Sequence, residues 1–282
     1  MDALDRLVWA ERRSMQAYGV RFAVRVSDAD AMAAVTSVLP PGTRVASRDR
    51  PERVYSYIVG GDGPRPGMRR LNLAYGNWTR LARSREGAVA LDALATDLRR
   101  HVAETAPRHV FVHAGAVEWD GRAIIVPGRS FTGKTTLVEA FLRMGARYLS
   151  DEFAVLDARG RVRPFAKPLS VRPDGSDRGV DVAVGDAAVA SGPVPVGAIV
   201  LTSYEPGGRY APRRGTPGEA AMALVGNALA ARRRPAHVLA AARAAAANGI
   251  VLKGRRGEAA AAARTIVERL AAGAADTTRR WA

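Results

Sequence analysis

Short stretches in which apolar and polar residues alternate dominate the first hundred residues, and this alternation is typical of strands with one buried face. Strands are predicted at residues 22–26, 54–59 and 70–75, with a loop at 60–64 between the last two. One helix is predicted from Ser27 and Asp30 to the Pro40-Pro41-Gly42 stop, and another has apolar residues at helical spacing over 89–102. These elements predict a small α+β unit over residues 1–106.

The rest of the chain alternates strands with helices, which predicts an α/β domain over residues 107–282. A strand at 109–118 turns at Asp120-Gly121 into a wholly apolar run, 123–126, as expected for a buried central strand. An amphipathic helix follows over 134–144 and ends at Gly145. Further strands are predicted at 153–156, 161–165, 197–204 and 250–254, and alanine-rich helices at about 218–231, 235–248 and 257–272.

Composition excludes several classes of protein. There is no cysteine, which excludes disulfides and thiolate chemistry, and no apolar run approaches the ~18 residues of a membrane span. The N-terminus lacks the layout of a signal peptide, so we expect a cytoplasmic protein without membrane contact. The net charge is +16, but the arginines are scattered without interleaved aromatic residues, which disfavours nucleic-acid binding.

Lysine is scarce: of the 43 basic residues only Lys134, Lys167 and Lys253 are lysines. This bias indicates that arginine has replaced lysine wherever it can serve. A compact ammonium and a planar guanidinium differ in what they can bind, so each lysine becomes a candidate for a specific role.

One glycine-rich run has the chemistry of a phosphate-binding loop. It comprises Gly128, Arg129, Ser130, Phe131, Thr132, Gly133, Lys134, Thr135 and Thr136. Backbone N–H groups and the N-terminus of the next helix attract phosphate, Lys134 reaches the β- and γ-phosphates, and Thr135 can ligate Mg²⁺. The required order of strand, loop and helix is predicted here, so we expect binding of a nucleoside triphosphate with Mg²⁺. No Asn-Lys pair is present, which disfavours a GTPase.

The sequence around this loop resembles the catalytic domain of HPr kinase/phosphorylase. The resemblance covers residues 109–172 and consists of His113-Ala114-Gly115-Ala116-Val117, the loop, and Gly145-Ala146-Arg147-Tyr148-Leu149-Ser150-Asp151-Glu152. It implies an HPr-kinase-like, PEP-carboxykinase-type P-loop fold. Shorter, divergent relatives, such as kinases that phosphorylate lasso-peptide precursors, fit better than the classical enzyme, and the oligomers of related enzymes imply a homo-oligomer.

The resemblance also implies roles for individual residues. Asp151 matches the general base for the acceptor hydroxyl, Glu152 matches a second acidic residue that binds Mg²⁺, and His113 matches a histidine that tunes the base. Lys167 and Arg172 lie in a similar Lys-Pro stretch and are expected to neutralise charge during transfer. Phe131 departs from the family, which has glycine there, and a phenylalanine tolerates positive φ poorly.

Together these features predict an ATP-dependent kinase that phosphorylates a serine or threonine hydroxyl of a peptide or small protein. A kinase of a small molecule such as free serine remains an alternative and predicts a closed acceptor pocket. A non-catalytic nucleotide-binding regulator would bind ATP without losing its γ-phosphate. The charge alone suggests a third alternative, an ATPase stimulated by nucleic acid.

Overall fold

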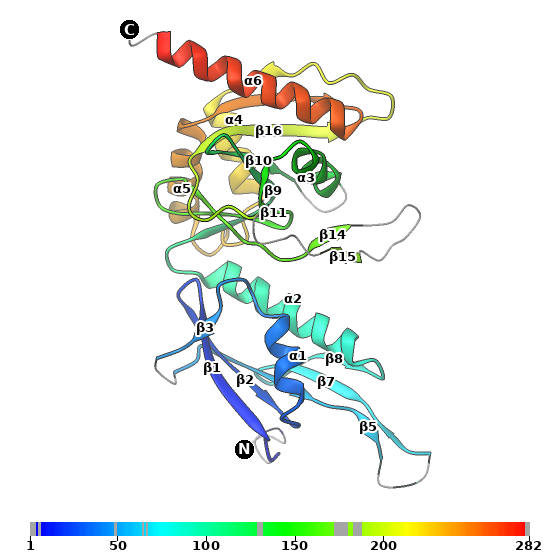
Figure 1. The fold of residues 1–282 in the computed structure, drawn as a ribbon. Helices are drawn as coiled ribbons and strands as arrows, with labels where there is room; N and C mark the ends of the chain where they lie inside the picture. Colours follow the sequence, from blue (N-terminus) through cyan, green and yellow to red (C-terminus); the bar gives the residue numbers. More distant parts are fainter. Residues whose placement is uncertain are drawn as a thin grey trace. The chain divides into compact units, whose positions relative to one another are not determined.

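The computed structural model describes residues 4, 7–47, 50–63, 65, 67–128, 132–171, 180–182 and 188–279. It is a mixed α/β protein whose chain divides into two compact units, Met1–Arg108 and His109–Ala282 (Figure 1). The sequence placed this division between residues 106 and 107. Among the described residues, no helix is long and apolar enough to span a membrane.

The first unit is a six-stranded sheet with two helices. Its strand order is β3-β1-β2-β4-β7-β8. The bounds are β1 Glu11–Ala17, β2 Val20–Val26, α1 Ala31–Ser37, β3 Arg44–Val45, β4 Arg53–Ile58, β7 Asn72–Gly76, β8 Thr79–Ser84 and α2 Gly87–Thr105, with a separate hairpin of β5 Gly61–Asp62 and β6 Arg69–Arg70. Helix α2 packs on β4, β7 and β8 through the stripe Leu94, Leu98 and Val102.

Strands β1, β3, β5 and β8 of this unit were not predicted from the sequence, and β5 lies in the segment at 60–64 that was predicted to be a loop. The outer half of β1 carries Glu11, Arg12 and Arg13, which obscure the alternation. Strand β8 lies at the edge of the sheet and exposes Arg80 and Arg83. A strand that buries little of either face does not need the apolar pattern that sequence analysis detects.

The second unit is built on a larger mixed sheet of order β13-β12-β9-β10-β16-β18-β17, with β11 also paired to β9. Strands β10, β16 and β18 are parallel, whereas β9 is antiparallel to β10, β11 and β12. The bounds are β9 Val110–Trp119, β10 Arg122–Pro127, α3 Lys134–Arg143, β11 Arg147–Ser150, β12 Phe153–Leu156, β13 Val162–Arg163, β14 Leu169–Val171, β15 Val180–Val182, β16 Val196–Tyr204, β17 Arg213–Arg214, α4 Pro217–Gly226, α5 Pro235–Ala247, β18 Ile250–Arg256 and α6 Ala259–Arg279.

Helices cover both faces of this sheet (Figure 1). Helices α4 and α5 share one apolar cluster with Ile125 of β10, and helices α3 and α6 share another with Ile124 and Val126 of the same strand. The wholly apolar sequence of β10 follows from this arrangement, because successive side chains of a central strand enter opposite cores. The described part of the unit is therefore layered helix, sheet, helix.

Some predicted boundaries were wrong. Helix α4 ends at Gly226 rather than near residue 231, because the chain then runs beside β9, where Leu229 N–H donates to Phe111 O. The strand predicted at 161–165 is only Val162–Arg163, and the next residue is Pro164, which has no N–H to donate. Strand β11 was not assigned from the sequence because Tyr148 and Leu149 are adjacent and flanked by the polar Arg147 and Ser150, so apolar and polar residues do not alternate.

Candidate functional site

The glycine-rich run connects the end of the apolar strand β10 to the start of helix α3. Gly128 N–H donates to the carbonyl of His113 on β9 at 3.1 Å, which ties the start of the run to the neighbouring strand. Gly133 precedes α3 with a φ of +75°, a conformation that favours glycine. A Cβ on Gly128 would lie 2.9 Å from Thr132 Oγ1, so the chain folds tightly here. Arg129, Ser130 and Phe131 lie outside the described residues.

Arg256, at the end of β18, holds the far end of the run. Its guanidinium donates to the carbonyl oxygens of Gly133 at 2.8 Å and Gly257 at 3.0 Å, and the residue is 2% exposed. Burial lowers the pKa of this guanidinium. Arg256 was not predicted to be a site residue, since nothing in the sequence distinguishes it from the many other arginines of the chain.

Asp151 lies where the chain passes from β11 to β12. Ser150 pairs with Ala116 of β9 and Phe153 pairs with His113, so the two acidic residues fall between two segments paired to one strand. The Ser150 hydroxyl accepts the N–H groups of Glu152 at 3.1 Å and Phe153 at 2.9 Å, which fixes the turn. The acidic pair is thereby held beside the strand that also contacts Gly128.

Tyr148 orients the Asp151 carboxylate. Its hydroxyl donates to Asp151 Oδ1 at 2.9 Å and accepts the Asp151 N–H at 3.1 Å. The tyrosine is fully buried, and burial, followed by the charge of Asp151, raises the pKa of its hydroxyl. The phenol therefore stays protonated and remains a donor. The sequence contained this residue within the resemblance but gave no sign of its role.

Lys167 lies beside both carboxylates. Its Nζ is 3.5 Å from Asp151 Oδ1 and 3.7 Å from Glu152 Oε2. The side chains of Lys167 and Asp151 are 17% and 3% exposed, so solvent screens their attraction only in part. The Lys167 ammonium therefore lies next to a carboxylate that is nearly removed from water.

Lys134 and His113 are two further predicted residues near Asp151 and Glu152. Burial lowers the pKa of the Lys134 ammonium, while the charge of Asp151 acts in the opposite direction. The His113 ring is exposed to solvent, yet nearby protein atoms and then the charge of Lys134 lower its pKa below the ordinary 6.5. Its ring centroid is 4.9 Å from that of Phe153. At neutral pH, His113 is therefore an uncharged imidazole.

The structure thus gathers five predicted residues at one edge of the sheet: His113, Lys134, Asp151, Glu152 and Lys167. Thr132 and Thr135 are partly buried beside the start of α3, and Thr136 is exposed. Arg172 lies outside the described residues. Lys253 is used elsewhere, since its Nζ donates to Glu219 Oε1 at 2.8 Å.

No cluster of three or more histidine and acidic side chains suited to a metal occurs in the described part of the chain. No model of a known protein family matches the chain, and no curated protein is a significant match. The function is therefore inferred from the residues of the site.

Proposed function

We propose that this protein is an HPr-kinase-like phosphotransferase that moves the γ-phosphoryl group of ATP to a serine or threonine hydroxyl of a peptide or small protein in the cytoplasm. The observation that carries the proposal is the position of Asp151. A nearly buried carboxylate, contacted by Lys167 and within the electrostatic influence of Lys134, lies beside a strand that also binds the start of a glycine-rich loop. Phosphoryl transfer needs such a combination of phosphate cradle, cations and base.

Each residue has a defined task in this reaction. The backbone around Gly128 and Gly133 and the ammonium of Lys134 bind the phosphates. Asp151 accepts the proton of the acceptor hydroxyl while the hydroxyl oxygen forms a bond to the γ-phosphorus. The bond between that phosphorus and the β–γ bridging oxygen breaks, which releases ADP. Lys167 balances negative charge during transfer. Tyr148 keeps the base oriented.

Mg²⁺ would supply further neutralisation of the phosphate charge. Magnesium usually binds through one or two carboxylates together with substrate phosphates, so an all-protein cluster is not required. The Glu152 carboxylate and the Thr135 hydroxyl are donors of the right kind, and Glu152 belongs to the turn that Ser150 fixes. These two residues are the ones that would hold the ion.

The acceptor is proposed to be a peptide or small protein, as in the precursor kinases that the sequence resembles. The net charge of +16 favours an acidic partner. The homo-oligomer implied by the resemblance is part of the same proposal. Free serine and other small acceptors are alternatives that a direct assay separates.

The test is mass spectrometry of candidate serine peptides and of free serine after incubation with ATP and Mg²⁺. Asp151→Asn should reduce transfer by about a hundred-fold or more, because a carboxamide cannot take the proton, while ATP binding persists. Asp120→Asn is the matched control: this exposed turn residue has a φ of +49°, which asparagine also tolerates.

Full transfer by Asp151→Asn would overturn the assignment of the base. ATP binding without phosphate loss to any acceptor would instead support a nucleotide-binding regulator.

A further inference from the structure

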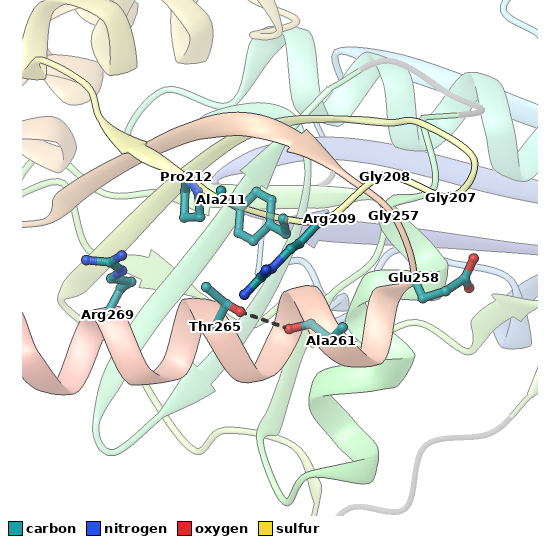
Figure 2. Close-up of a pocket in the computed structure, with 11 residues that line it drawn as sticks. Gly207, Gly208, Arg209, Ala211, Pro212, Gly257, Glu258, Ala261, Thr265 and Arg269 are labelled. Atoms are coloured by element: carbon teal, nitrogen blue, oxygen red, sulfur yellow. Dashed lines mark hydrogen bonds between the residues drawn. The ribbon is translucent and has the colours of Figure 1, made fainter.

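A pocket of about 670 Å³ lies between the loop at residues 207–212 and the first turns of α6 (Figure 2). Its size lies within the range of small-molecule sites. Its walls come from Gly208, Tyr210 and Pro212 on the loop side and from Ala261, Thr265 and Arg269 on the helix. None of these residues was selected from the sequence.

The pocket lies at the same edge of the sheet as the phosphate-binding loop. The loop follows β10, residues 205–212 follow β16, and Gly257 follows β18, and these three strands are parallel. Ligands of open α/β sheets bind at the carboxyl ends of such strands. Arg256 makes the link direct: it bonds to the Gly133 carbonyl, and the next residue, Gly257, lines the pocket.

The catalytic residues and the pocket lie on opposite sides of the loop. Asp151 is beside β9, the neighbour of β10 on one side, whereas the pocket is beside β16 and β18 on the other. A triphosphate that presents its γ end to Asp151 therefore directs its other end toward the pocket. That end carries the nucleoside.

The lining suits a flat ring with polar edges. Gly257 approaches Gly208 so closely that a Cβ would collide with the Gly208 carbonyl, which joins the loop to the turn before α6. Arg209 extends from the loop toward α6, and Arg269 projects from that helix (Figure 2). Guanidinium groups such as these stack on aromatic rings. Glu258 also lines the pocket, and its side chain projects away from Arg209 and Thr265 (Figure 2).

The Tyr210 hydroxyl provides independent evidence that the pocket binds a ligand with a hydrogen-bonding group. It is 8% exposed, and its hydroxyl has no hydrogen-bond partner within the described ranges. Buried hydroxyls normally find a partner, because leaving one unpaired costs about 1–3 kcal/mol. A ribose hydroxyl or a ring nitrogen in the pocket would satisfy it after a small shift.

We infer that this pocket binds the nucleoside of the nucleotide whose phosphates lie on the Gly128–Lys134 loop. The inference rests on the proposed function, since it takes the phosphate position as given. It assigns the base and ribose to the loop at 207–212 and to α6, and it leaves the region around His113 and Asp151 to the acceptor.

Calorimetric titration of the full chain with ATP and with inorganic tripolyphosphate tests the inference. Ala261→Trp fills the pocket from an exposed helical position. It should weaken ATP binding about ten-fold or more and leave tripolyphosphate binding unchanged, because only ATP carries a nucleoside. Ala260→Trp, also exposed on α6 but outside the pocket lining, is the matched control and should bind both like the wild type.

Tyr210→Phe is a second variant that retains the ring. It should keep the folded stability, since the lost hydroxyl has no hydrogen-bond partner among the described residues, and weaken ATP binding by several-fold. Unchanged ATP binding in Ala261→Trp, or equal losses of ATP and tripolyphosphate, would overturn the nucleoside pocket. If the wild type binds neither molecule, the kinase proposal itself fails. If it binds both with equal affinity, only the pocket is refuted.

Discussion

At the scale of single residues, the scarce lysines separate into two uses. Lys134 and Lys167 belong to the electrostatic surroundings of Asp151, whereas Lys253 binds Glu219, the residue that completes the capping box of α4 with Thr216. The Lys253 hydrogen bond, together with the Thr216 N–H, lowers the pKa of Glu219 to about 2. Lys253 therefore has a structural contact that explains it without a role in the site.

Tyr148 is the residue whose replacement best tests the geometry of Asp151, the proposed base. Tyr148→Phe removes the donor to Asp151 Oδ1 and the acceptor of the Asp151 N–H. We expect a loss of about 1–3 kcal/mol in the free energy of unfolding, measured by urea denaturation.

We also expect phosphoryl transfer to slow by about ten-fold while ATP binding is unchanged, since the carboxylate loses the donor that orients it. A stability loss with an unchanged rate of transfer would show that Tyr148 supports the fold alone.

At the scale of elements, the packing of β9 against α3 sets the position of the loop. Gly115 lies opposite Val126 on β10, and a Cβ there would be 2.8 Å from Val138 Cγ2 on α3. The small residue lets the helix approach the strand, and the loop that joins β10 to α3 depends on that approach. Glycine at this position is needed for space rather than for backbone conformation.

Gly115→Ala should therefore lower the free energy of unfolding by about 1–3 kcal/mol and weaken ATP binding, because Val138 is buried and has little freedom to move. Gly226→Ala is the control, since Gly226 is an exposed helical residue with no atom within 4 Å of the added Cβ. That change should be neutral or stabilising by at most about 1 kcal/mol. Equal effects from the two substitutions would contradict the close approach of α3.

At the scale of the whole molecule, both units carry histidines that resist protonation. The pKa values of His101 in the first unit and of His113 and His237 in the second lie below the ordinary 6.5, with burial as the first cause. On acidification the unfolded chain takes up these protons first. The free energy of unfolding should therefore fall as pH drops through 6.5 and level off below the folded pKa values.

Thermal unfolding followed by circular dichroism across this range measures the effect. Because the His101 Nε2 is buried without a hydrogen-bond partner in the described part of the chain, His101→Gln should reduce the dependence of the first unit on pH. A melting temperature that rises on acidification would contradict the expectation.

The sequence by itself determined the local features of this protein. Apolar alternation located β2, a wholly apolar run located β10, helical spacing located α2 and α3, and alanine-rich composition located α5. The order of strand, glycine-rich run and helix located the loop. These features depend on neighbours in the chain, so periodicity and turn chemistry reveal them. The acidic pair and Lys167 were selected through a resemblance, and the structure places them within a few ångströms of one another.

Only the tertiary structure decided which distant residues meet. The contact of Arg256 with Gly133 joins residues 123 positions apart, and the pocket combines a loop and a helix that no local pattern connects. Edge strands such as β8 escaped detection because they bury little. The role of Tyr148 arises from a turn that folds the chain back by three residues. Such contacts depend on strand pairing and packing across the sheet, which a chain's local pattern of apolar and polar residues does not specify.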